Sequence, residues 1–196
     1  MEYSPKDKSF SVWLPETGGR RSERESTIHL RGTRVKFDQV QVQQTKGATY
    51  FAAAINLPLQ FTRGSTPQQN IELLRDAIVK ELTGKIDEEK DVEQGRLKGK
   101  EYTIITGQGQ ARARIFAMGH RVYEARVTGS KDQVASADAD TFLDSYRSPG
   151  PGSATATEPA PKGGNSGAAS PEPKTDDKLA GSGDAICGRL DCAPLA

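Results

Sequence analysis

The feature of this sequence that most restricts its fold is a run of three strand patterns within residues 101–128. In each pattern apolar and polar residues alternate, as in a β-strand with one covered face. The three stretches are 102–106, 111–118 and 121–128. The last two are separated only by Gly119-His120, and a two-residue connection that begins with glycine predicts a type II′ hairpin. This hairpin would place Phe116 opposite Tyr123, so we expect consecutive antiparallel strands.

A short helix pattern follows these strands at residues 136–146. Ser136 can cap the helix through its hydroxyl group, and Asp138 is favourable in the first turn. The apolar residues that share one side are Ala139, Phe142, Leu143 and Tyr146. We therefore expect this helix to dock its apolar side on the sheet.

The first part of the chain shows similar alternation. Strands are expected at 10–14, 27–30, 34–44 and 49–57. Within 34–44, Val35 and Val40 have opposite parity, which favours a bulge or bend near Asp38. Trp13 has the parity opposite to Phe10, and we interpret it as a core residue of a sheet covered on both faces.

The clearest helix signal lies between Thr66 and Gly84. Thr66 can cap the helix, Pro67 suits the first helical position, and Gln69 can complete a capping box. The apolar stripe of this helix comprises Ile71, Leu74, Ile78 and Leu82. Residues 85–93 then predict a solvated strand at a sheet edge, because they carry the acidic run Asp87-Glu88-Glu89.

This order of elements predicts an α+β fold, with an antiparallel β-sheet of about six to eight strands covered by helices. The composition changes sharply after residue 147, where Pro, Gly, Ser, Ala and Thr become dominant. We therefore predict a domain at 1–147 and a flexible, disordered tail at 148–196. The apolar end of the tail, with Cys187 and Cys192, is a frayed terminus, a short docking motif or a small disulfide loop.

Composition restricts the kinds of partner. With 27 basic and 26 acidic residues the net charge is +1, which does not favour nucleic acid or an anionic membrane as a partner. No stretch of about 18 apolar residues could span a bilayer, and the N-terminus lacks the pattern of a signal peptide. We expect a soluble monomer whose compartment is unknown; a leader missing from this chain would instead make it exported or lipid-anchored.

Two pairs of arginines are the candidate binding residues. Arg112 and Arg114 share one strand face, and the hairpin register places them opposite Val127 and Ala125. They are suited to an anion or a carboxylate-bearing partner. The alternative is that they mark the exposed end of a partly covered face.

The second pair is Arg20 and Arg21, which we expect at the tip of a polar, mobile loop spanning 16–24. Such a loop could hold a phosphate or an acidic partner, or it could simply be solvated. The partner, whether a protein or a small molecule, is unknown.

No catalytic constellation is apparent in the sequence. His29 and His120 each lack a second ligand or catalytic residue at suitable spacing, and the phosphate-binding glycine motifs are absent. We therefore expect no catalytic residues, no metal site and no cofactor, and we predict that the protein is not an enzyme.

The layout of these segments resembles a known superfamily. The resemblance rests on 3–5, 10–12, the helix after Pro67, 99–101, 112–115, 121–123 and 136–146, and it extends over nearly all of 3–147. These segments resemble uncharacterised bacterial domains similar to the PsbP-like α/β/α sandwich. Members of that superfamily include photosystem extrinsic subunits, a Ran-binding nuclear import factor and bacterial lipoproteins.

The resemblance implies a non-catalytic accessory or binding module that uses its sheet edge, the 16–24 segment or the face of Arg112 and Arg114. Two alternatives stay open. One is an enzyme of unrecognised type, since polar groups are present although they match no known catalytic spacing. The other is a domain tethered to a surface or assembly through residues 148–196.

Overall fold

The computed structural model of the 196-residue chain describes residues 1–16, 19–45 and 47–148. The predicted tail, with Cys187 and Cys192, lies outside the described residues from position 149 onward. The strands are β1 (Glu2–Tyr3), β2 (Val12–Trp13), β3 (Gly19–Leu30), β4 (Thr33–Gln44), β5 (Thr49–Asn56), β6 (Lys85–Gln94), β7 (Leu97–Thr106), β8 (Gly109–Met118) and β9 (Arg121–Gly129). The helices are α1 (Leu59–Thr62), α2 (Pro67–Glu81), α3 (Lys131–Val134) and α4 (Ala137–Ser145).

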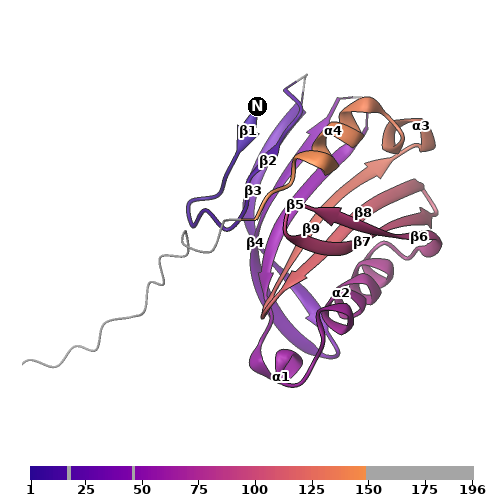
Figure 1. Cartoon of the computed structure of the whole chain (residues 1–196). Coiled ribbons are helices and arrows are strands. Elements are labelled where there is room, and N and C mark those ends of the chain that lie inside the picture. The colour runs from indigo at the N-terminus through magenta and orange to yellow at the C-terminus, as the bar shows by residue number, and fades with distance from the viewer. Residues whose placement is uncertain (17–18, 46, 149–196) are drawn as a thin grey trace, which may run out of the picture. The chain divides into compact units, whose positions relative to one another are not determined.

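Seven of the strands form one antiparallel sheet in the order β3-β4-β5-β9-β8-β7-β6 (Figure 1). The α+β class and the antiparallel sheet predicted from the sequence are thus confirmed. The hairpin at Gly119 is confirmed as well, since this glycine has a φ of 61° and Phe116 pairs with Tyr123. β3 and β6 form the two edges of the sheet, and β9 lies at its centre.

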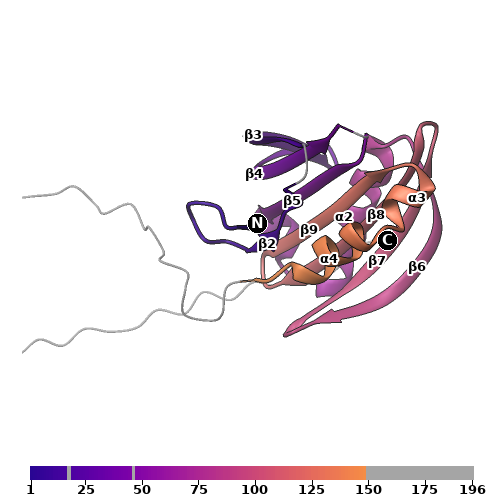
Figure 2. The ribbon, with the colours of Figure 1, turned by 90° about the horizontal axis from the view of Figure 1, so that it is seen from above.

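Both faces of the sheet are covered. On one face, the helix α2 packs over residues of β7, β8 and β9, with Leu74 and Ile78 fully buried. On the other face, α4 and the small β1–β2 sheet pack over a second apolar cluster that contains Phe142 and Val12 (Figure 2). We refer to these as the α2 face and the α4 face. The sheet is thus the central layer of a sandwich.

Local capping sets the ends of both long helices. The Thr66 hydroxyl accepts a hydrogen bond from the Gln69 N–H, and the Gln69 side chain accepts one from the Thr66 N–H, which confirms the predicted capping box. Ser136 caps α4 by accepting from the Ala139 N–H. At the end of α4, the buried Tyr146 hydroxyl donates to the Ala53 carbonyl at 2.9 Å, which fixes this helix against β5.

Three local predictions were wrong. The strand expected at 10–14 is confined to Val12–Trp13, which pairs with β1 outside the main sheet. There is no loop at 19–24, because β3 begins at Gly19 and pairs with β4 along its whole length. The short helices α1 and α3 were not predicted from the sequence at all.

The expected bulge near Asp38 is also absent, since the β3–β4 register runs through this residue unbroken. The parity of the apolar residues changes along β4 because Val35 faces the α2 side and Val40 faces the α4 side. Each half of the strand is therefore buried on a different face. A register shift does occur in β6, between Ile86 and Glu88.

Candidate binding site

Arg112 and Arg114 lie on the α4 face of β8. The predicted register is confirmed, with Arg112 opposite Val127 and Arg114 opposite Ala125. Their side chains are only 17% and 12% exposed, so they do not form an exposed end of the sheet. This interpretation was wrong because α4 covers this part of the face.

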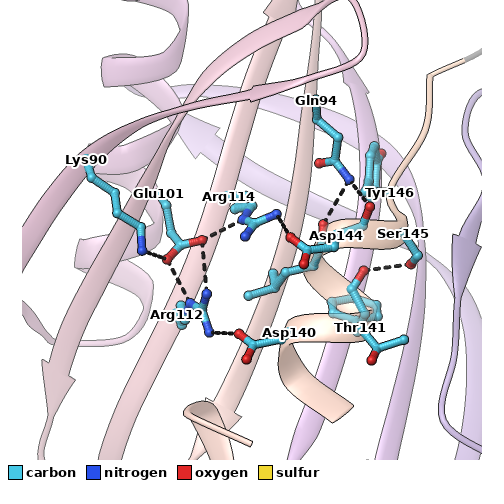
Figure 3. Close-up of polar contacts among 12 residues, drawn as sticks. Lys90, Gln94, Glu101, Arg112, Arg114, Asp140, Thr141, Asp144, Ser145 and Tyr146 are labelled. Carbon is cyan, nitrogen blue, oxygen red and sulfur yellow. Dashed lines mark hydrogen bonds and ion pairs between the residues drawn. The ribbon is translucent and has the colours of Figure 1, made fainter. Parts of the chain in front are cut away.

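Both arginines converge on Glu101 of β7, which is 2% exposed (Figure 3). The Nε atom of Arg112 donates to Oε1 of Glu101 at 2.7 Å, and Nε of Arg114 donates to Oε2 at 2.5 Å. From β6, the Lys90 ammonium group lies 2.8 Å from Oε1. One buried carboxylate therefore pairs with three cations.

The cations keep Glu101 ionised. Burial by itself raises the pKa of this carboxyl group, but hydrogen bonds from Arg112, Lys90 and Arg114 outweigh it and lower the pKa from 4.5 to about 2. At neutral pH the three cations therefore surround a carboxylate that carries its full negative charge.

Two aspartates of α4 complete this network. The Nη1 atom of Arg112 contacts Asp140 at 2.5 Å, and Nη1 of Arg114 contacts Asp144 at 2.6 Å. The side chain of Gln94 also reaches over the end of α4 and donates to the carbonyl of Asp144 (Figure 3). The cluster thus ties α4 to β6, β7 and β8. Its carboxylates accept hydrogen bonds from Nε, Nη1 and Nη2 of Arg112 and from Nε and Nη1 of Arg114.

Arg20 and Arg21 lie on the edge strand β3, and both are exposed. Because they are consecutive strand residues, their side chains leave opposite faces of the sheet. Arg21 lies 3.4 Å from Glu23 and over the ring of Tyr3, at 5.6 Å from its centroid. Three strands separate β3 from β8, so the structure does not bring the two arginine pairs into one site.

A second buried charge pair on β9 was missed by the sequence analysis. Glu124 and Arg126 are 2% and 6% exposed and lie on the α2 face. The Nε atom of Arg126 lies 3.1 Å from Oε1 of Glu124, and its Nη2 atom lies 3.3 Å from Glu81 of α2. The guanidinium group also lies over Phe51, 4.7 Å from the ring centroid. Glu124 and Arg126 occupy polar positions in the alternation of β9, so the pattern alone gives no sign that they are buried.

The environment of Glu124 differs from that of Glu101. Burial raises its pKa from 4.5 to about 7; Arg126 opposes this shift and the nearby Glu81 adds to it. A carboxyl group with a strongly shifted pKa is a feature that binding and catalytic sites share with structural ion pairs.

The remaining candidates stay apart from these clusters. His29 lies on β3 and His120 in the β8–β9 turn, and both are exposed. Across the described ranges, no group of three or more histidine, cysteine or acidic residues could hold a metal ion. No helix among these residues combines the length and apolar character that a membrane crossing requires.

The architecture defined by this sheet and its two covered faces is a PsbP-like α/β/α sandwich. The solution structure of cyanobacterial PsbP from Synechocystis sp. PCC 6803 is similar, with a TM-score of 0.52. The match covers 76% of this chain and 91% of that one at 11% identity, so the likeness concerns the fold. No family model and no curated protein matches the sequence.

Proposed function

We propose that the domain is a non-catalytic binding or accessory module that accepts an extended, acidic segment of a partner protein along the free edge of β3. The observation that carries this proposal is the exposure of the edge. Every residue from Gly19 to Glu25 is exposed, and among the described strands β3 pairs only with β4. An open strand edge offers N–H and C=O groups to which an extended peptide can add as a further strand.

The charges along β3 favour an acidic segment. Its two carboxylates are already paired within the chain, Glu23 with Arg21 and Glu25 with Lys36. Arg20 makes no ion pair with any residue in the described ranges, so its charge is available to a partner. Arg24 has only a long hydrogen bond, 3.5 Å, to the side chain of Gln41.

The opposite edge of the sheet has the reverse character. β6 carries five acidic residues, namely Asp87, Glu88, Glu89, Asp91 and Glu93. Glu89, Asp91 and Glu93 are paired with Lys98 and Lys100 of β7. Asp87 and Glu88 make no ion pair within the described ranges, so they repel an acidic segment and charge distinguishes the two edges. Arg112 and Arg114 stay a candidate contact only for a partner that displaces α4, because their donors are engaged by Glu101 and α4.

The accessory role is drawn by analogy with cyanobacterial PsbP, to which this chain is similar in fold. In this proposal the domain of residues 1–147 acts as a monomer on a protein partner, and nucleic acid is not its ligand. Residues 148–196 then serve as a connection to another body.

A synthetic peptide that alternates glutamate with valine is the probe for this edge. We expect it to shift the backbone amide resonances of β3, and the double variant Arg20→Glu/Arg21→Glu should weaken its binding by about tenfold or more, because it places like charges together. The control is Lys98→Glu, a charge reversal at an 84% exposed side chain on β7, the strand next to the opposite edge of the sheet. Equal binding by the double variant, or shifts confined to β6, would refute the proposal.

A further inference from the structure

A cavity of about 660 Å³ lies where α2 ends against the sheet. Its volume is within the range of small-molecule sites. The polar side chains lining it are mostly amides and hydroxyls, including Gln43, Thr49, Thr83, Gln108, Gln110 and Thr128. Among the described residues that line the cavity, Glu81 is the one with a charge.

The strand register arranges part of this lining in one row. Gln43 of β4 pairs with Thr49 of β5, and Thr49 pairs with Thr128 of β9. Amide and hydroxyl groups both donate and accept hydrogen bonds, so such a row is suited to the hydroxyl groups of a ligand. The lining therefore favours a hydroxylated molecule over an apolar one.

Arg126 lies directly beside this row, two residues before Thr128 on the same face of β9. Its side chain is buried, and within the described part of the chain neither Nη1 nor Nε makes a hydrogen bond, although Nε lies 3.1 Å from Oε1 of Glu124. Its remaining nitrogen, Nη2, donates to Oε1 of Glu81 at 3.3 Å. A guanidinium group usually binds a carboxylate through two parallel hydrogen bonds, so this arginine retains unused donor capacity.

Glu81 is free to leave Arg126. It is the last residue of α2, its side chain is 56% exposed, and it already lines the cavity. Its carboxylate therefore occupies the position that the carboxylate of a ligand would take on Arg126.

We propose that this cavity binds a small hydroxylated carboxylate of the sugar-acid class, whose carboxylate replaces that of Glu81 on Arg126. The hydroxyl groups of the ligand bond to the amides and hydroxyls of the lining. The row ends next to the β3 edge, since Gln43 stands opposite Arg20 of β3, but Arg20 and Arg21 do not line the cavity, and the two sites are tested by different variants.

The probe is glucuronate, and glucose is the matched neutral ligand. Titration calorimetry on the full chain should give tighter binding of glucuronate by about tenfold, the ratio expected for a charged hydrogen bond. The variant E81Q should bind glucuronate more tightly than the parent, since it removes the competing carboxylate. On the same helix, E72Q removes an equal charge away from the cavity and should leave the affinity unchanged.

Two further variants complete the test. T128V removes one hydroxyl of the lining at nearly constant volume and should weaken both sugars, whereas R126M should remove the preference for glucuronate. The proposal is overturned if glucose binds as tightly as glucuronate or if neither binds. It is also overturned if E81Q leaves the affinity for glucuronate unchanged or lowers it. Because Glu81 is exposed, this variant should fold like the parent, so its result can be interpreted.

Discussion

Glu101 and Glu124 are two glutamates of equal burial on opposite faces of one sheet. Each is 2% exposed, yet the pKa of Glu101 is lowered to about 2 and that of Glu124 is raised to about 7. Burial raises both values, and it is the cationic partners of Glu101 that reverse the direction of its shift. Glu101 has three cations within hydrogen-bonding range, whereas the one cation next to Glu124 among the described residues is Arg126, in a contact without hydrogen-bond geometry.

Cross-strand register explains why the partners differ. Glu101 stands directly opposite Lys90 on β6 and Arg114 on β8, so both neighbouring strands supply a cation. Glu124 stands opposite Ala53 and Ile115, which supply none. The same residue type is therefore stabilised as an anion on one face and favoured as a neutral acid on the other.

The two glutamates should give stability opposite dependences on pH. The lowered pKa of Glu101 adds stability that is fully present above about pH 4.5 and is lost as the pH falls toward 2. The raised pKa of Glu124 means that the folded state retains a proton that the unfolded chain releases. Its contribution therefore declines as the pH rises from 4.5 through 7.

The largest expected effect is that of Glu101→Gln. This change leaves Arg112 and Arg114 buried without their common anion, and it should lower the free energy of unfolding by about 3–5 kcal/mol at pH 7. Urea denaturation of the variant and the parent measures this loss. The matched control is Glu88→Gln at an exposed position of β6, which should change stability by less than about 0.5 kcal/mol. If the two variants were equally stable, the Glu101 cluster would have no role in holding the fold.

The next effect is a change of slope caused by Glu124→Gln. The parent should lose on the order of 3 kcal/mol of stability between pH 4.5 and 7 through this one group, and the variant should lack that contribution. Urea denaturation at a series of pH values gives both curves, and their difference isolates the group. Parallel curves would show that Glu124 titrates alike in the folded and unfolded chains, and the comparison with Glu101 would then fail.

The sequence was sufficient to predict the parts of the fold that depend on local chemistry. The hairpin at Gly119 and the caps at Thr66 and Ser136 each need only a few neighbouring residues, and all three were confirmed. The register of Arg112 and Arg114 followed from that hairpin. The sheet that joins them to the rest of the chain depends on pairings between distant segments, which alternation alone does not specify.

The partners of the arginines could not be predicted for the same reason. Glu101 directly precedes the strand predicted at 102–106, so the strand pattern gives no reason to expect a buried carboxylate there. Glu124 and Arg126 have the parity that would face solvent if only one face of β9 were covered. Only the packing of α2 on the second face makes them a buried pair, and the apolar stripe of α2 does not identify the strands that it covers.

The smallest effects are expected from the outer members of the α4 cluster, Asp140 and Asp144. Their side chains are 53% and 67% exposed, so water and salt screen their attraction to the arginines. Asp140→Asn and Asp144→Asn should each cost about 1 kcal/mol or less in urea denaturation, and the cost should shrink as sodium chloride is added. Glu101→Gln should keep most of its cost in salt, because its partners are buried. If either aspartate variant lost as much stability as Glu101→Gln, the arginines would be held by α4 and not by Glu101. The contrast between Glu101 and Glu124 would then depend on the packing of this helix and not on the strand register.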